Sequence, residues 1–467
     1  MAKEKSASSI LKEKLMMKNE NIFKNTTLKQ QKDALDFCEG YKKFLAVAKT
    51  EREACETVEK LAIDAGFVNV EKKKTLKPGD RIYLNNRGKA IILAVIGSDS
   101  PAEGFRISAA HIDSPRLDLK PNPLYEDSEM AYFKTHYYGG IKKYQWTSIP
   151  LALHGVVIRG DGSKVNICIG EDEGDPVFVI NDLLPHLAKE QSKRTLSEGI
   201  QGEELNILVG SRPFNNDPDS DLIKLNILNI LYEKYGITEN DFITAELEAV
   251  PAFAPKDIGF DRSMIGAYGH DDRVCAYPAV AATLNCAKVP KKTVITILAD
   301  KEEIGSEGNT GLHSVFFKHF VERLVKGTNV SVLDALSKSM CLSADVSGAY
   351  DPNFPEPFER RNTCFVNHGA VIMKYTGARG KGDTSDASAE LMGEIRQILD
   401  SNKVKWQVGE LGKVDFGGGG TVAKELAALG IDVVDLGVPV LSMHSPFEVV
   451  GKMDVYMTYL ALKAFFK

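Results

Sequence analysis

The chain has 467 residues, whereas a single hydrophobic core stops growing at roughly 250–300 residues, so we expect two domains. Hydrophobic residues make up 43% of the chain and charged residues 26%; these fractions are typical of soluble globular proteins and exclude disordered and fibrous classes. The formal charge is -6 and the Lys and Arg residues are scattered. A surface for nucleic acid is therefore not expected.

The seven cysteines are odd in number and form no C-x-x-C pair. This pattern argues against a disulfide framework and against a zinc site built from cysteine. The N-terminal segment carries Lys and Glu throughout and lacks the apolar core of a signal peptide, and no run of 18 apolar residues occurs anywhere. We therefore expect a cytoplasmic protein without a membrane span.

Helix and then sheet are predicted for the first part of the chain. Apolar residues recur at helical spacing over residues 28–66, and Thr50 followed by Glu53 is typical of a capping box that starts a second helix. Residues 81–97 alternate as a β-hairpin does, and residues 105–111 form another short apolar strand. Sheet is thus expected from about residue 82.

The pattern changes between about Pro121 and Pro255. Short strand-like runs alternate there with polar connections, and one helix is predicted over residues 220–236. We interpret this stretch as a separate β-rich domain that interrupts the first.

After Pro255 helices and strands alternate, which predicts a largely parallel sheet covered on both faces. The expected helices cover residues 273–285, 315–325, 386–400, 421–430 and the C-terminus, and the expected strands cover residues 293–300, 340–346, 370–375, 404–410 and 431–440. Together with the hairpin before residue 111, this part should form one α/β domain.

The most informative local pattern is the acidic segment after the apolar strand 293–299. Asp300, Glu302 and Glu303 follow that strand directly, and ligands in open α/β sheets collect at the carboxyl ends of strands. Neighbouring glutamates there point in different directions, so one can bind a metal while the other acts as general base on a water. A solvated acidic loop is an equally reasonable interpretation of this segment alone.

Four further segments each present a single candidate ligand. His111, with Asp113 beside it, Asp345 and His444 follow apolar strands, and Asp271 lies at an expected helix start. Separately, each fits a buried structural histidine or a helix cap as well. Together they form the nitrogen and oxygen donor set of a zinc pair, with metals about 3.5–4 Å apart. No H-E-x-x-H helix is present, which disfavours a single-zinc protease of the thermolysin type.

These segments also carry a family resemblance. AAHIDSPRLDLKP, GHDDR, DKEEIGSEG, SADVSGAYDPNFPE and VPVLSMHSPFE, in this order, resemble the aspartyl aminopeptidase family of dinuclear zinc exopeptidases from about residue 30 to the end. The resemblance implies a three-layer αβα catalytic domain, residues 1–117 and 256–467, with an inserted β-rich dimerisation domain, residues 118–255. It also implies a homo-oligomer, a tetrahedral dodecamer built from dimers that encloses its active sites.

The resemblance further implies two zinc ions per subunit and a role for each matching residue. His111 and Asp345 would bind one zinc and Glu303 and His444 the other, while Asp271 would bridge the two. Glu302 would be the general base, and Asp113 would orient His111. Cobalt or manganese could replace zinc with the same ligands.

Substrate contacts are suggested at five positions. His186 in the insert resembles the family segment that reaches a neighbouring subunit's active site, although a second family histidine is replaced here by Glu190. His368 and Lys374 approximately match a basic strand that faces the substrate, and Lys374 could pair with a substrate carboxylate. Backbone N–H groups at Gly418 and Gly419 could hold a substrate oxygen. Each of these residues has an equally simple structural or solvated interpretation.

The function that the resemblance implies, and that the expected donor set fits, is a zinc-dependent aminopeptidase that removes single residues from the N-terminus of peptide substrates. Histidines that the family commonly has after Asp345 are absent from residues 347–351, so an acidic first residue is not specified. The alternatives are a self-assembling scaffold without catalysis and a hydrolase of other amides, such as acylated amino acids. None of the seven thiols is needed for the expected chemistry.

Overall fold

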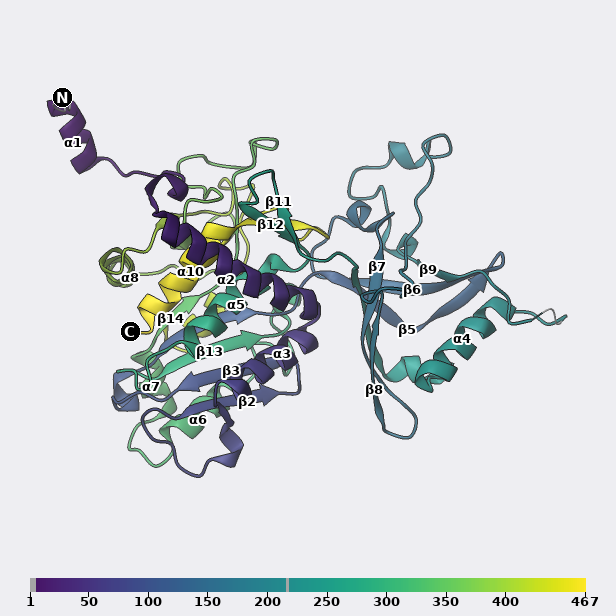
Figure 1. Ribbon diagram of the computed structural model, residues 1–467, viewed down its shortest axis with the longest axis horizontal. Coiled ribbons are helices and arrows are strands. Elements are labelled where there is room, and N and C mark those ends of the chain that lie inside the picture. Colours follow the sequence, from purple (N-terminus) through teal and green to yellow (C-terminus); the bar gives the residue numbers. More distant parts are fainter. Residues whose placement is uncertain (1–5, 216–217) are drawn as a thin grey trace.

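A computed structural model describes residues 6–215 and 218–467 of the chain. The larger part is a sheet with helices on both faces, and a β-rich part lies beside it (Figure 1). The short helix α1 (Ala7–Leu15) extends away from the larger part and buries none of its residues. Of the N-terminal segment in which no signal peptide is expected, residues 1–5 lie outside the described residues.

The larger part is built on a nine-stranded mixed sheet. The strands, in spatial order, are β1 (Val68–Asn69), β2 (Arg81–Asn86), β3 (Ala90–Val95), β13 (Val294–Ala299), β4 (Arg106–His111), β14 (Met340–Ser343), β18 (Asp432–Gly437), β16 (Ala370–Met373) and β17 (Trp406–Val408). Five of the eight pairings are parallel, and three are antiparallel. The expected hairpin is β2–β3. Its strand β3 pairs with β13, which comes after the insert in the sequence, so the hairpin belongs to the same sheet as the C-terminal part.

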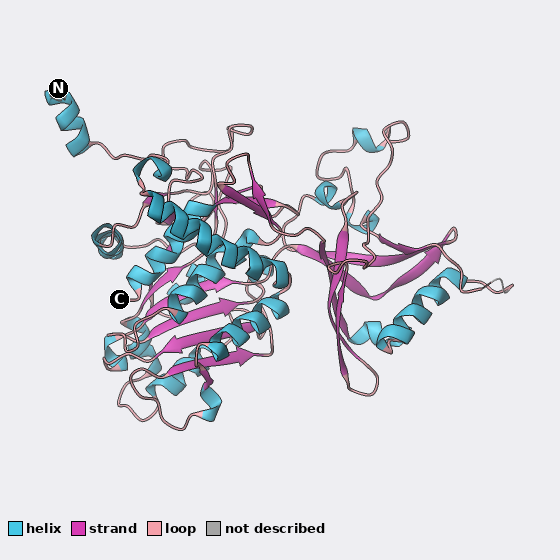
Figure 2. Ribbon diagram, viewed as in Figure 1, coloured by secondary structure: helices cyan, strands magenta, loops and turns pink. Residues whose placement is uncertain are grey.

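Helices cover both faces of this sheet, which gives three layers, αβα (Figure 2). One face packs against α2 (Leu28–Val47), α3 (Glu51–Asp64), α5 (His270–Leu284), α8 (Ala389–Ser401) and α10 (Lys452–Phe465), and the other against α6 (Phe316–Val325), α7 (Val332–Ser337) and α9 (Ala423–Ala427). The two-residue period of a strand explains this division. In β3, Ile91 and Leu93 enter the first core, whereas Ile92 and Ala94 enter the second.

The β-rich part is a six-stranded antiparallel sheet with a core of its own. Its strands, in spatial order, are β8 (Lys164–Ile169), β7 (Leu151–Ile158), β10 (Ala245–Pro251), β5 (Arg116–Asp127), β6 (Met130–Tyr138) and β9 (Ile207–Gly210). The expected helix is α4 (Leu222–Tyr235), which packs on this sheet. All seven cysteines of the chain are free.

One expected strand divides between two sheets. Residues 431–440 were predicted as a single strand, but β18 ends at Gly437, and β19 (Pro439–Leu441) joins a third sheet with β11 (Lys256–Ile258), β12 (Met264–Ala267), β15 (Ser347–Gly348) and β20 (Glu448–Gly451). At the division a Cβ on Gly437 would lie 1.6 Å from the carbonyl oxygen of Asp345. Only glycine allows this approach, which brings the chain past Asp345.

A buried ionic network joins the two parts. Arg116, at the start of β5, lies 3.3 Å from Glu51 of α3 and 3.1 Å from Glu248 of β10. Its guanidinium also lies over the ring of Tyr138, 3.8 Å from the centroid. Glu51 is fully buried, and Lys89 lies 3.4 Å from it on its other side. A buried carboxylate such as that of Glu51 is strongly destabilising when its counter-charge is removed.

Arg116→Ala should therefore lower the free energy of unfolding by about 3–5 kcal/mol, because it leaves Glu51 buried without its main counter-charge. Urea denaturation of both proteins measures the difference. Arg194→Ala is the matched control, since Arg194 pairs with Glu204 on the surface of the same β-rich part, and such pairs contribute at most about 1 kcal/mol. Equal losses for the two variants would contradict a structural role for the network.

Candidate active site

The candidate ligands meet at one edge of the nine-stranded sheet. The strands β13, β4 and β14 are parallel neighbours, with Ala299 of β13 paired to His111 at the end of β4. Glu302 and Glu303 follow β13 in a short 3-10 turn (Glu302–Ile304), and Asp345 follows β14. Parallel strands end on the same side of a sheet, so these residues converge there.

Asp271 and His444 complete the group from outside the sheet. Asp271 lies in the first turn of α5, where its dihedral angles are not helical and its peptide bond to Asp272 is cis. His444 follows β19 with a φ of 64°, in the left-handed region. Its N–H donates to Glu448 and its Nδ1–H to the carbonyl of Gly140. These two bonds hold a backbone conformation that a histidine rarely adopts.

Asp271 presents one carboxylate oxygen to each histidine. Its Oδ1 lies 3.1 Å from Nε2 of His111, and its Oδ2 lies 3.2 Å from Nε2 of His444. Asp345 lies 3.9 Å from the first Nε2, and Glu303 lies 3.6 Å from the second. Two three-residue groups therefore share Asp271, and in each the donor atoms all lie within 4.8 Å of one another: His111, Asp271 and Asp345 in one, and Asp271, Glu303 and His444 in the other.

Buried oxygens in this group have no hydrogen-bond partner, which fits a bound cation. Among the described residues, Oε1 of Glu303 is buried without a hydrogen-bond partner, and Oδ1 of Asp271 forms no hydrogen bond although Nε2 of His111 lies 3.1 Å away; such an arrangement costs free energy unless a cation satisfies the oxygens. Both histidines donate from Nδ1 to a carbonyl, of Asp113 and of Gly140, so Nε2 is the ring nitrogen that each histidine turns toward the carboxylates. Imidazole nitrogen and carboxylate oxygen are ligands that zinc accepts.

Asp113 connects His111 to the glutamate turn. One of its oxygens lies 3.3 Å from Nδ1 of His111, and the two oxygens accept the N–H groups of Glu302 and Glu303, each at 3.2 Å. The hydroxyl of Tyr138 donates to the same carboxylate at 2.8 Å. Sequence reasoning missed Tyr138, which ends β6 of the β-rich part and has no motif of its own.

Glu448 connects Asp271 and His444, the two candidate ligands that do not follow strands of the nine-stranded sheet. It is buried and accepts the N–H of Asp271 at 3.1 Å and the N–H of His444 at 2.7 Å. Burial raises the pKa of Glu448 to about 8, and the neighbouring Asp271 adds to the rise. Its only sequence signal is its place at the end of the HSPFE motif, four residues after His444.

Burial of several carboxylates side by side determines the electrostatics of the site. Burial raises the pKa of Glu303 and of Asp345 above the ordinary range, and nearby carboxylates add to the effect. Burial likewise raises the pKa of Glu302 to about 7. Asp271 is the exception, because the two imidazoles outweigh its burial and hold its pKa low. The site thus favours binding of positive charge.

Two of the suggested substrate residues are engaged elsewhere. Lys374 pairs with Asp386 at 2.7 Å, and Nδ1 of the half-buried His368 lies 2.6 Å from the side-chain oxygen of Asn19. His186 is exposed on a loop of the β-rich part. None of these three belongs to the groups of possible metal ligands among the described residues.

The run of four glycines at residues 417–420, which contains Gly418 and Gly419, is packed against a neighbouring segment rather than open to a ligand. The N–H of Gly419 donates to the carbonyl of Thr376, so it is not free for a substrate oxygen. Gly418 has a φ of 113°, and a Cβ there would lie 2.4 Å from the Cα of Ala378. The run therefore makes a close contact with the segment after β16.

An αβα sheet with a cluster of histidine and carboxylate donors at its strand ends is typical of metal-dependent hydrolases built on open α/β folds. The family model described as aminopeptidase I zinc metalloprotease (M18) matches residues 44–466. The chain therefore belongs to the M18 family of zinc metalloproteases, and it is an aminopeptidase that uses zinc.

Individual relatives agree with this assignment. The probable M18 family aminopeptidase 1 of Clostridium acetobutylicum is 49% identical over 459 residues, which cover 97% of this chain and 98% of the relative. The crystal structure of an M18 family aminopeptidase from Thermotoga maritima is 43% identical, covers 97% of this chain and 99% of its own, and superposes with a TM-score of 0.92. The structure of aminopeptidase I from C. acetobutylicum, 46% identical, gives the same TM-score over 97% of this chain and all of its own.

Within the described part of the chain, no helix is long and apolar enough to span a membrane.

The position of Glu448 generates a test. Glu448→Gln replaces one accepting oxygen by a donor, so one of the two N–H groups loses its bond and a zinc-binding residue shifts. We expect zinc affinity 10–100-fold weaker, measured by competition with a chromogenic chelator. Asp454→Asn is the matched control, because buried Asp454 also accepts two backbone N–H groups, from Asn367 and Gly369. Unchanged zinc affinity in Glu448→Gln would show that this carboxylate does not position the ligands.

Proposed function

We propose that this aminopeptidase acts through two zinc ions held by five residues, with Asp271 between them. The observation that carries the proposal is the orientation of Asp271, whose two oxygens face two different histidines at 3.1 and 3.2 Å. Asp345 belongs to the His111 side and Glu303 to the His444 side. Three ligands on each side leave coordination positions for water and substrate, as catalytic zinc sites require.

The choice between the two glutamates rests on exposure. Both Glu302 and Glu303 can join a donor group with His111, but the side chain of Glu303 is only 4% exposed and that of Glu302 is 18% exposed. Glu303 also lies 3.6 Å from Nε2 of His444, whereas the ion-pair distance of Glu302 is to Nε2 of His111, at 3.8 Å. We assign Glu303 as the ligand and Glu302 as the general base.

Glu302 then has a defined task in peptide hydrolysis. When bound, zinc would lower the pKa of a water and polarise the scissile carbonyl. Glu302 takes the proton of the attacking water at its carboxylate and returns it to the departing amine. Asp113 accepts the N–H groups of both glutamates and faces His111, so the base and the ligands keep fixed positions relative to one another. The reaction releases the N-terminal residue of a peptide.

We further propose that residues 118–255 form the dimerisation domain of a homo-oligomer and that residues 1–117 and 256–467 form the catalytic domain. Large apolar side chains are exposed on this insert, among them Leu187, Leu196, Tyr232 and Ile243, each at least 60% exposed. The fold is shared with the mApe1 dodecamer of S. cerevisiae, 21% identical with a TM-score of 0.75 over 92% of this chain, which supports a dodecamer; the tetrahedral arrangement is the one that the family resemblance implies. The loop with His186 would then face a neighbouring subunit. Free thiols throughout the chain fit a cytoplasmic location.

Glu302→Gln tests the proposed base. Glutamine keeps the size of the side chain but cannot take a proton, so kcat should fall by about 100-fold or more while the zinc content stays unchanged. Release of an aminoacyl chromophore gives the rate, and elemental analysis gives the metal.

The matched control is Glu307→Gln, which changes an exposed glutamate of the same loop that pairs with His313. It should retain near-normal turnover. If Glu302→Gln also turns over normally, Glu302 is not the base, and if it loses zinc, Glu302 is a ligand.

The pH dependence of kcat/KM gives a second test. Glu302 must be ionised to accept a proton, so activity is lost as the pH falls through its pKa. Burial raises that pKa from 4.5 to about 7, and bound cations would draw it back down, so the acid limb should lie between these values. Recovery of activity on returning to neutral pH controls for unfolding. A rate that stays constant to below pH 4.5 would contradict the assignment.

A further inference from the structure

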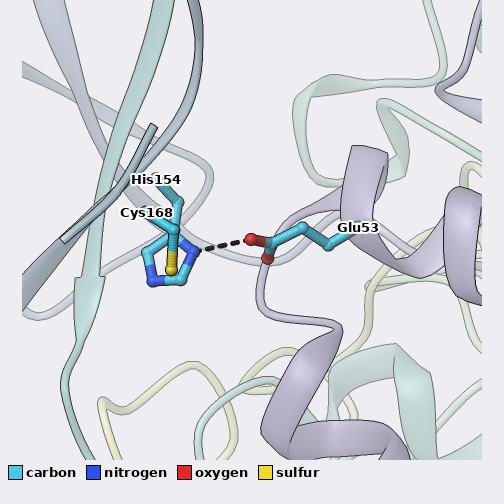
Figure 3. A group of neighbouring side chains, drawn as sticks. All are labelled: Glu53, His154 and Cys168. Atoms are coloured by element: carbon cyan, nitrogen blue, oxygen red, sulfur yellow. Dashed lines mark hydrogen bonds and ion pairs between the residues drawn. The ribbon is translucent and has the colours of Figure 1, made fainter. Parts of the chain in front are cut away.

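A second cluster of possible metal ligands lies outside the active site, between the two parts of the molecule. It contains Glu53 of α3, His154 of β7 and Cys168 of β8, whose donor atoms lie within 4.8 Å of one another (Figure 3). His154 and Cys168 are directly opposite in the antiparallel pair β7–β8, so their side chains share a face of the sheet. Glu53 reaches them from the first turn of a helix in the αβα part.

We propose that Glu53, His154 and Cys168 bind a zinc ion that fastens α3 to the β-rich sheet. Thiolate, imidazole and carboxylate together form a donor set that zinc accepts, and water would complete a tetrahedral site. The cluster lies apart from the proposed catalytic pair, and its ligand set includes a thiolate, which the proposed catalytic pair lacks.

The surroundings of His154 prepare it for a metal. The residue is 2% exposed, and its Nε2 lies 3.1 Å from Glu171, whose carboxylate is fixed by Lys49 at 2.6 Å. A carboxylate on one ring nitrogen leaves the other to face the ligand site, which is the usual arrangement around zinc-bound histidine. Here that other nitrogen is Nδ1, which faces Glu53.

The geometry requires only a small movement of Glu53. Its Oε1 lies 2.7 Å from Nδ1 of His154, a hydrogen-bond distance, whereas two donors on one tetrahedral zinc are roughly 3.4 Å apart, given bonds of about 2.1 Å. Glu53 is 26% exposed and can withdraw by that difference. Its Oε2 meanwhile accepts the N–H groups of Lys49 and Thr50. Binding releases the proton between Glu53 and His154 and the thiol proton of Cys168.

An ion can reach the cluster from solvent. Glu53 and Cys168 line an open cavity of about 510 Å³, where Glu56 and Glu59 of α3 add negative charge and three cations, Arg52, Arg87 and Lys164, oppose it. The competing arrangement is a protonated His154 held between two carboxylates. Burial opposes that charge, but Cys168, Glu171 and Glu53 outweigh it and raise the pKa of His154 to about 11. A metal must therefore displace a firmly held proton. A bond between the metal and the thiolate of Cys168 exists only in the metal-bound arrangement, so it distinguishes that arrangement from the protonated one.

Cobalt is the probe, because a Co²⁺ ion bound to thiolate absorbs in the near ultraviolet through charge transfer from sulfur, whereas nitrogen and oxygen ligands give no such band. We expect the full-length enzyme, stripped of metal and titrated with Co²⁺, to develop this band, and Zn²⁺ to remove it. Cys168→Ser should abolish the band and leave aminopeptidase activity unchanged. Glu53→Gln should weaken Co²⁺ binding at the band by tenfold or more while its remaining oxygen still caps α3.

Cys286→Ser is the matched control, since Cys286 is partly exposed but belongs to no such group of donors in the described residues, and it should retain the band. Both variants change surface-accessible thiols, so the fold should persist in each. The proposal is overturned if no thiolate band appears once enough Co²⁺ has been added to fill the catalytic pair and this site, or if the band survives Cys168→Ser. Failure here would leave the assignment of Glu302 and of the catalytic pair unaffected.

Discussion

Four carboxylates crowd together at one edge of the nine-stranded sheet, and the organisation of the active site follows from how the fold tolerates them. Asp271, Glu303 and Asp345 have side chains at most 8% exposed, and Glu302 is 18% exposed. Fully ionised, they carry four negative charges, which two divalent cations would balance. Without cations such a group holds protons instead, as the raised pKa values of Glu303 and Asp345 indicate. The fold thus buries these carboxylates at a cost in free energy, and metal binding would offset that cost.

Positioning residues from several elements hold this cluster in place. Asp113 fixes the glutamate turn and faces His111, and Glu448 fixes Asp271 and His444. Both histidines donate from Nδ1 to a backbone carbonyl, which directs each Nε2 to the carboxylates. Such contacts set ligand orientation before any metal arrives.

The β-rich part contributes to the catalytic edge as well as to the proposed oligomer. Tyr138, at the end of β6, donates to Asp113, and the carbonyl of Gly140, two residues later, accepts from His444. The ring of Tyr138 lies under Arg116, which belongs to the ionic network with Glu51. A shift of this sheet relative to α3 would therefore disturb both sides of the active site.

Much of this architecture is encoded locally. Helical spacing, the capping box at Thr50 and the alternation of residues 81–97 predict α2, α3 and the hairpin β2–β3, and the structure confirms them. The candidate ligands are recognisable because each follows an apolar strand or begins a helix. Tyr138, Glu448 and the division at Gly437 escape prediction, because their roles come from contacts between distant segments that no period or motif records. The packed state of the glycine run has the same cause, since Thr376 and Ala378 occupy its surroundings.

The central claim is that Asp271 bridges two zinc ions, and anomalous diffraction at the zinc edge from crystals of the full-length enzyme tests it most directly. The account predicts two peaks at this edge of the sheet, about 3.5–4 Å apart, one beside His111 and Asp345, the other beside His444 and Glu303, with an oxygen of Asp271 on each. A single peak in zinc-saturated crystals, or two peaks of which only one touches Asp271, would contradict it.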